Sequence, residues 1–211
     1  MTNPTAESAT SRLREEHQLI LQVADATQVL VAEADAGNWD FDGFDQCVTF
    51  IRLFADACHH GKEEDLLFPE LEKAGMSREQ GPIAVMLEEH RIGRRYVQFM
   101  AEALEPARAG DEEARARLLN AARGYVDLIR GHIMKEDHVL FDMADHVVRG
   151  SSCQSLCVAY GAVCARRFEG HSKEELASYI RKLEADYDNE VFDTQMGDLK
   201  DWLEQQGIRV D

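Results

Sequence analysis

The chain has 211 residues, which is long enough for one full hydrophobic core with a small appendage. Its 40 acidic residues outnumber 23 basic ones, which gives a formal net charge of -17 and a sequence pI of about 4.8. This charge opposes attraction to phosphate backbones and anionic lipids, so the sequence predicts no nucleic-acid partner and no membrane partner.

The N-terminal stretch from Met1 to Arg14 is polar and lacks the apolar segment of a signal peptide. No run of residues is long and apolar enough to cross a bilayer. The five cysteines are an odd number spread along the chain, unlike the framework of a secreted disulfide-rich protein. We therefore expect a cytoplasmic protein with reduced thiols.

The first two predicted helices follow a flexible tail, residues 1–9. Apolar residues recur at helical spacing from Thr10 or Ser11, either of which can cap the first helix, which ends at Gly37. A second helix begins at Phe44 after a connector and has Pro69 near its end.

The third predicted helix begins after Ser77 and ends around Pro106 and Gly110, and the fourth opens at Asp111 as N-cap and continues to about Val148. Few β-branched runs occur and the apolar period is near four, which argues against strands. The sequence thus predicts an all-α chain, with four long helices in residues 10–149.

Residues 150–211 are predicted to form a helical C-terminal extension. Cys153, Cys157 and Cys164 lie on one helix face, either as small hydrophobic residues in a packing seam or as a thiol cluster for redox sensing or metal exchange. Ser172 and Glu175 form a capping box for a further helix, and another helix is predicted up to Gln206. We expect the extension to pack on the bundle, to lengthen it, or to bind a second copy or a protein partner.

Two stretches of the chain repeat one pattern. Residues 59–68 and 132–141 both have the pattern His-x-x-Lys-Glu-acid-x-apolar-Leu-Phe. Glu-Glu-His at residues 15–17 recurs at residues 88–90, with the same offset as that between the longer stretches. A constant offset between two such units predicts a duplicated helical hairpin.

The repeated His and Glu residues are candidate metal ligands. A His and a Glu four residues apart lie on one helix face, and burying so many ionisable groups is unfavourable by several kcal/mol each unless a metal and mutual pairing compensate. Imidazole and carboxylate donors without a thiolate suit iron, manganese or zinc, and bridging carboxylates favour a pair of metals. The predicted metal ligands are His17, His59, Glu63, His90, His132 and Glu136.

Within this set, Glu63 and Glu136 are predicted to bridge the metals. His17 and His59 are assigned to one metal and His90 and His132 to the other, or the pairs cross. His60 is either a fifth imidazole or gate at the centre or, more simply, a residue packed at the helix edge. Other residues are interpreted as core (Cys58, Met86, Met134, Met143) or as surface histidines (His138, His146, His171).

With these motifs the chain resembles the hemerythrin-like, His-His-Glu cation-binding family, whose members are up-down-up-down four-helix bundles with a non-haem di-iron centre. The resemblance runs from about His17 to Phe141, supported by Leu-Phe-Pro at residues 67–69 and Met-x-Glu-Glu-His at residues 86–90. It implies two iron ions with an oxo or hydroxo bridge, rather than manganese or zinc.

The resemblance also bears on function. Oxygen-carrying members have another His one turn from the third-helix His, where this chain has Met86 and Arg94. They also have an Asp on the last helix; Asp137 stands five residues after His132, although the first repeat favours Glu136. This departure favours the more symmetric members, which are associated with iron–sulfur cluster repair, nitric oxide and oxygen response, or iron handling.

The resemblance therefore implies a protein that binds or reduces O2, NO or peroxide in redox or nitrosative stress. An alternative is a non-enzymatic iron or oxygen sensor whose metal occupancy controls a partner interaction. A second alternative is a di-metal peroxidase or oxidase. No catalytic side chain beyond the ligands is predicted.

Overall fold

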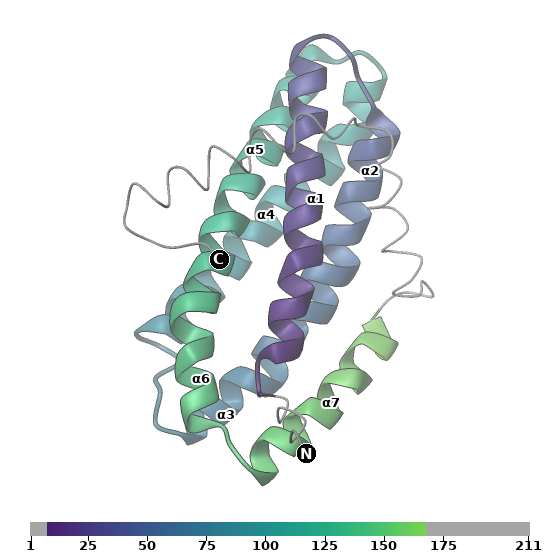
Figure 1. The fold of residues 1–211 in the computed structure, drawn as a ribbon. Helices are drawn as coiled ribbons and strands as arrows, with labels where there is room; N and C mark the ends of the chain where they lie inside the picture. The colour runs from purple at the N-terminus through teal and green to yellow at the C-terminus, as the bar shows by residue number, and fades with distance from the viewer. Residues whose placement is uncertain (1–7, 168–211) are drawn as a thin grey trace, which may run out of the picture.

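The computed structural model describes residues 8–167, and all regular structure in this range is helical (Figure 1). The all-α prediction is thereby confirmed. The predicted tail up to residue 7, His171, the capping box at Ser172 and the last helices lie outside the described residues.

Four long rods lie side by side and alternate in direction, so the bundle runs up, down, up, down (Figure 1). The first and third rods are single helices, at residues 11–35 and 82–108. The second rod (residues 41–73) and the fourth rod (residues 112–147) each combine α-helical segments with π-helical ones, which are labelled η. The helices are α1 (Ser11–Asp35), α2 (Phe41–Phe50), η1 (Ile51–His60), η2 (Glu63–Leu67), α3 (Phe68–Lys73), α4 (Pro82–Arg108), α5 (Glu112–Lys135), η3 (Glu136–Leu140), α6 (Phe141–Val147) and α7 (Ser151–Arg167).

Side-chain caps fix where two of the rods begin. The Asp111 carboxylate accepts a hydrogen bond from the backbone N–H of Ala114 at 3.0 Å, as the sequence predicts for an N-cap. The Asp40 carboxylate accepts one from the N–H of Gly43 at 2.8 Å, so α2 begins at Phe41 rather than at the predicted Phe44. The apolar pattern did not reveal this cap, because Asp40 lies in the stretch that the sequence analysis interprets as a connector.

Two other helix ends lie where the sequence predicts them, although their local contacts differ from the expectation. α1 begins at Ser11, but the Thr10 hydroxyl donates to the Asp145 carboxylate at 2.8 Å instead of capping the helix, while the Ser8 hydroxyl accepts from the N–H of Ser11. α4 continues through Pro106 to Arg108, because a proline in the last turn removes a single backbone donor. Gly110, at a φ of 97°, then ends the rod.

The hydrophobic core has two clusters, one on each side of a polar layer. In α1, Ile20 belongs to the cluster that fills most of the bundle, whereas Leu13 belongs to the cluster near α3, α6 and α7. The same division separates Cys58 from Leu67 in the second rod. Since the repeated His and Glu residues lie between these positions, the fold holds them at one level inside the bundle.

α7 packs against the bundle as part of the second cluster. Leu156 and Tyr160 are buried, and the Tyr160 hydroxyl donates to the Ala9 carbonyl at 3.1 Å. α7 contacts η1 and η2, the segments that carry several of the candidate ligands. Of the arrangements expected for the C-terminal extension, α7 adopts packing on the bundle. The predicted domain boundary at residues 149–150 stays a prediction.

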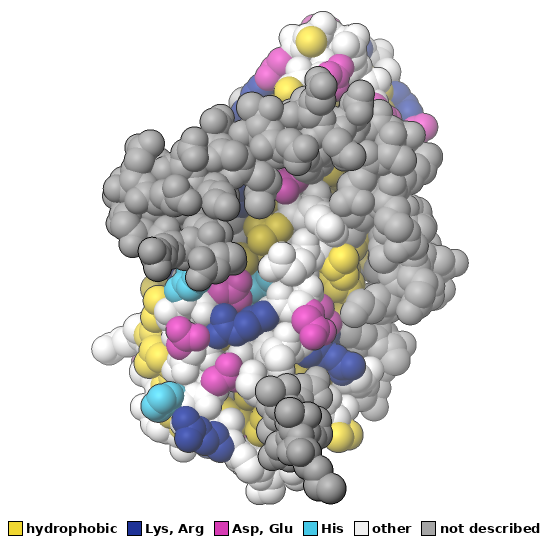
Figure 2. All heavy atoms as spheres, viewed as in Figure 1, with side chains coloured by type: hydrophobic (Ala, Val, Ile, Leu, Met, Phe, Trp, Pro, Cys, Tyr) yellow, Lys and Arg dark blue, Asp and Glu magenta, His cyan; other side chains and the backbone are white. Residues whose placement is uncertain are grey.

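On the face drawn in Figure 2, acidic and basic side chains are interspersed over the lower half. Arg14, for example, makes an ion pair of 2.8 Å with Asp142. Within residues 8–167, no helix combines the length and apolar character that a membrane span requires.

Replacing Tyr160 with Ala should test how firmly α7 is held. The side chain is completely buried, so Tyr160→Ala is expected to lower the free energy of unfolding by about 3–5 kcal/mol. Val158→Ala is the matched control, because Val158 is 80% exposed on the same helix and should change stability by less than about 0.5 kcal/mol. Urea unfolding followed by circular dichroism measures both, and equal small effects would contradict the packing of α7.

Candidate metal centre

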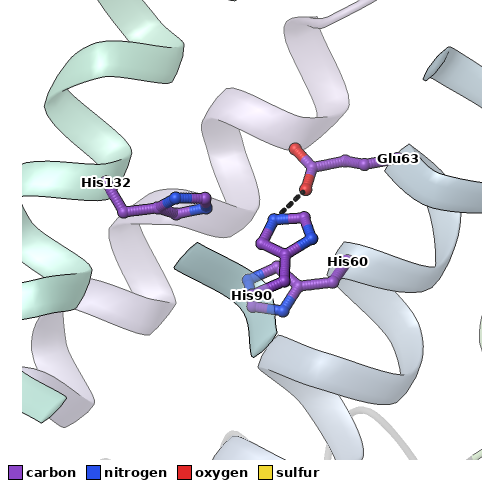
Figure 3. A group of neighbouring side chains, drawn as sticks. All are labelled: His60, Glu63, His90 and His132. Atoms are coloured by element: carbon purple, nitrogen blue, oxygen red, sulfur yellow. Dashed lines mark ion pairs between the residues drawn. The ribbon is translucent and has the colours of Figure 1, made fainter. Parts of the chain in front are cut away.

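One group of candidate ligands comes from three rods of the bundle. His60, Glu63, His90 and His132 are all buried, and one ligand atom from each lies within 4.8 Å of the others (Figure 3). The His60 and His90 rings are stacked, with their centroids 3.8 Å apart. The structure therefore brings His60 to the centre rather than leaving it at the helix edge.

A second group lies beside the first and shares Glu63 with it. This group contains His17, His59, Glu63 and Glu136, all buried and within the same 4.8 Å limit. The Nε2 atoms of His17 and His59 are 3.0 Å apart, so both rings point to one place between α1 and the second rod.

Glu63 and Glu136 lie between the two pairs of histidines. The Glu63 oxygens are 3.6 Å from His59 Nε2 and 3.4 Å from His90 Nε2. The Glu136 oxygens are 3.2 Å from His17 Nε2 and 3.3 Å from His132 Nε2. Each carboxylate thus turns one oxygen to each pair of histidines, which is the placement that a bridging carboxylate requires.

Most of the inward atoms of these residues lack a hydrogen bond from any described residue. Both oxygens of Glu63 and of Glu136 are buried and unpartnered, as are the Nε2 atoms of His90 and His132. Each such atom destabilises a fold by about 1–3 kcal/mol when nothing satisfies it. These donors fit metal cations, since nitrogen and oxygen atoms of this kind are ligands for iron, manganese and zinc.

A carboxylate behind each of four histidines orients its ring. The Nδ1–H of His17 donates to Asp137 at 2.8 Å, and that of His90 donates to Glu64 at 2.8 Å. This contact turns Nε2 toward the centre, which is the arrangement found behind metal-bound imidazoles.

The other two histidines have equivalent partners. The Nδ1–H of His59 donates to Glu16 at 3.2 Å, and that of His132 donates to Glu89 at 3.0 Å. Lys62 in turn donates to Glu16, and Lys135 donates to Glu89. The sequence analysis missed these outer carboxylates and lysines, although the repeated Glu-Glu-His and Lys-Glu-acid runs contain all of them.

Comparison with known proteins agrees with this geometry. A family model, described as Hemerythrin HHE cation binding domain, matches residues 8–144. The chain belongs to the hemerythrin family. Its membership, together with the two groups of ligand-type side chains, supports the binding of a metal cation.

The relatives of this hemerythrin-family chain add little about function. It is 28% identical over 118 residues to an uncharacterized protein of Mycobacterium bovis and to uncharacterized proteins of two Mycobacterium tuberculosis strains. The matched region covers 56% of this chain and 46% of each relative, so the chain spans about half the length of the curated relatives it matches. No solved structure matches it.

The electrostatic environment favours anionic carboxylates facing cationic or metal-bound imidazoles. Burial alone would raise the pKa of Glu63, but the nearby His59 and His90 outweigh it and lower that pKa well below its usual value. Burial would lower the pKa of His17, yet the Asp137 and Glu136 carboxylates beside its ring raise it to about 9. The pKa of His90 is raised to about 9 in the same way, by Glu63 and Glu64.

His60 has the opposite environment from its stacked neighbour. Burial, together with the charge of His90, holds the pKa of His60 well below 6.5. The His60 ring is therefore neutral in the protein, which is the protonation state that a metal-ligating imidazole needs.

π-helical segments explain why His60 faces the centre, one of the two alternatives that the sequence left open. Glu63 begins η2 and Glu136 begins η3, at equivalent positions of the two repeats, whereas η1 has no counterpart in α5. In an α-helix, successive residues lie about 100° apart. The wider π-helical turn of η1 reduces this angle, so both His59 and His60 face the centre.

Several other sequence interpretations are settled by burial. His138 and His146 are exposed as expected, and Met86 is buried near the site. The interpretation of Met134 and Met143 as core residues is wrong, since they are 53% and 40% exposed on the outer side of the last rod.

The cysteines also depart from expectation. Cys58 is a core residue, as predicted, but it is disulfide-bonded, so the prediction of reduced thiols is wrong at this position. Its partner sulfur lies outside the side chains that the structure describes. Cys153 and Cys157 are half-buried on α7 without a disulfide, and the side chain of Cys164 is not among those described.

Metal binding should release protons. In the metal-free protein, His17 and His90 have pKa values of about 9, and each must lose its Nε2 proton to bind a cation. We expect about two protons per chain to be released at pH 7, and metal affinity to rise with pH up to about 9. Calorimetry in buffers of different ionisation enthalpy measures this release, and a count independent of pH would contradict it.

The same pKa shift makes the metal-free fold sensitive to alkali. Because the pKa of His17 in the folded state lies above 6.5, its ion pairs stabilise the metal-free protein below pH 6.5. This contribution should be lost as the pH rises through about 9, while the metal-loaded protein should not lose it. Thermal unfolding of both forms between pH 6 and 10 tests the difference.

Proposed function

We propose that this hemerythrin-family chain binds a pair of iron ions between its four long helices. The observation that carries the proposal is the placement of Glu63 and Glu136, whose four oxygens are buried, unpartnered and directed to two separate pairs of histidines. A single cation would use only half of these atoms. Two cations at the shared carboxylates would use all of them.

In this proposal each iron has its own set of imidazoles. His17 and His59 bind one iron, and His90 and His132 bind the other, with His60 as a further imidazole on the second. Glu63 and Glu136 would help to hold both ions, because each has one oxygen facing each pair of histidines. The family resemblance supports iron over manganese and zinc, whereas the mixed nitrogen and oxygen donors suit all three metals.

The proposed activity is binding or reduction of O2, NO or peroxide. When bound, the iron pair supplies open coordination positions and one-electron redox chemistry for these small molecules. The polypeptide contributes neutral imidazoles held in one orientation by Glu16, Glu64, Glu89 and Asp137. The two core clusters cover the polar layer from above and below along the bundle.

A sensor role is supported by one specific contact. α7 packs on η1 and η2, which carry His59, His60 and Glu63. A change in metal occupancy that moves these segments would therefore reach α7 directly, and through it a partner bound at residues 150–211. Hydrogen exchange in α7, compared with and without metal, distinguishes this role from that of a reductase.

Removing one bridging carboxylate should abolish most metal binding. Glu63→Ala is expected to lower iron affinity at least about 100-fold, because both ions lose a ligand and the facing imidazoles lose their counter-charge. Glu15→Ala is the matched control, since Glu15 is an exposed glutamate on α1. Iron per chain is measured by elemental analysis on anaerobically purified protein.

The same samples test the identity and number of the ions. About two irons per chain, with a visible spectrum that changes on exposure to O2 or NO, is the expected result. One zinc per chain, or full iron occupancy with an unchanged spectrum in Glu63→Ala, would contradict the proposed centre.

A further inference from the structure

A cavity of about 390 Å³ lies between η1, α4 and α5 and reaches the candidate metal centre. Its inner end is formed by the buried imidazoles of His60, His90 and His132. Its outer end is bordered by exposed residues, among them Arg52 and Gln98. This volume is far larger than a diatomic gas or hydrogen peroxide needs and falls in the range of small-molecule sites.

The walls of the cavity are mainly apolar. Ile51, Val97, Leu128 and Ile129 supply aliphatic surface from all three helical segments. A guest in this space would bury apolar area against them, which is the main source of affinity in small-molecule pockets.

The cavity occurs on one side of the duplicated fold. Gly93 lines it at the position where the first repeat has Ile20, whose side chain is buried in the core. His60 lies where the second repeat has Ile133, which is likewise a core residue. At these two positions the chain departs from its own repeat, and both departures face the same space.

Gly93 is not required by close packing of the helices. A Cβ atom at this position would lie 3.6 Å from Leu128 Cδ2 and 4.0 Å from Tyr125 Cε2, which are ordinary contacts. A glycine inside a helix is less favourable than alanine by about 0.5–1 kcal/mol. The residue therefore leaves space that the packing itself does not need.

Tyr125 gives the cavity a specific polar feature. Its side chain is 2% exposed, and its hydroxyl has no hydrogen-bond partner among the described residues. Burial raises the pKa of Tyr125 further above its ordinary value, so the hydroxyl stays protonated and can donate. A buried donor of this kind is satisfied when a bound molecule brings an acceptor to it.

The charges around the mouth are largely paired within the protein. Arg94 makes ion pairs of 2.7 Å with both Asp56 and Glu64, and Glu89 is paired with Lys135. Arg52 and Glu102 also line the cavity and make no ion pair with a described residue, but both are exposed. The buried part of the cavity therefore has no unpaired charge to match on a guest, which favours an uncharged molecule.

We infer that this cavity is a binding site for a small, uncharged, mainly apolar organic molecule with one oxygen acceptor, which accepts a hydrogen bond from Tyr125. Such a molecule would lie against the imidazoles of His60, His90 and His132. A role for this molecule in a reaction at the metal centre rests on the function proposed above. The cavity itself is formed by the polypeptide alone.

Benzophenone is a suitable probe, because it combines two apolar rings with a single carbonyl acceptor and attaches covalently to nearby C–H groups on illumination. 1,1-Diphenylethylene has nearly the same shape and no acceptor, so it is the matched ligand control. We expect saturable binding of benzophenone to both metal-free and metal-loaded protein. Photolabelling followed by mass spectrometry should place the label on peptides from η1, α4 or α5.

Two substitutions separate the hydrogen bond from the volume. Tyr125→Phe should weaken benzophenone binding about five- to tenfold and leave 1,1-diphenylethylene binding unchanged. Gly93→Ile, which introduces the residue of the first repeat, should weaken both ligands more than about tenfold because it fills the cavity.

A milder pair of variants protects the test against misfolding. Gly93→Ala is expected to fold and to weaken both ligands about two- to fivefold. Gly131→Ala is the matched control, because no atom lies within 4 Å of an added Cβ there and binding should be unchanged. Equal affinities in the wild type, Gly93→Ala and Gly93→Ile, or photolabel only on other helices, would overturn the inference.

Iron content measured on the same variants separates the two proposals. If the protein binds benzophenone saturably but contains no iron, the cavity site is supported and the proposed iron centre is contradicted. If the protein contains two irons per chain but does not bind benzophenone saturably, the iron centre is supported and the cavity site is contradicted.

Discussion

The structure depends on holding ionisable groups inside a helical bundle. Within residues 8–167, every fully buried His, Glu or Lys belongs to the metal-centre groups or is linked to them through Glu16. Burying a charge is unfavourable by several kcal/mol unless it is paired or bound to a metal. The helices, their π-helical segments and the division of the core into two clusters all serve to place these groups against one another.

Each of four imidazoles is held by a carboxylate that is itself held by a cation. Glu16 is paired with Lys62 and Glu89 with Lys135. Glu64 is paired with Arg94 at 2.7 Å, and Asp137 with Arg14 at 3.6 Å. Arg14, Arg94 and Lys135 are partly exposed, whereas Lys62 is buried with its carboxylate. The paired carboxylates fix the ring orientations before any metal is present, which lowers the entropy lost when a cation binds.

The duplicated hairpin produces a nearly symmetric centre with one asymmetric side. The two central carboxylates of Glu63 and Glu136, the four principal imidazoles and the two lysines recur at one offset, and so do η2 and η3. η1, His60 and Gly93 have no equivalent in the other repeat. The asymmetric side also contains the cavity, so the two groups of ligand-type side chains differ in access as well as in composition.

The sequence by itself determined the helical class, the duplication and six of the inward-facing residues, because a fixed spacing along a helix decides which side chains share a face. It also contained the outer carboxylates, which went unrecognised since their role depends on a partner from another rod. Only the tertiary structure decided that His60 faces the centre, that Gly93 and Tyr125 border a cavity, and that Met134 and Met143 lie outside. These outcomes depend on local departures from the α-helical period and on distances between helices, and neither quantity is encoded in the spacing of residues along one chain segment.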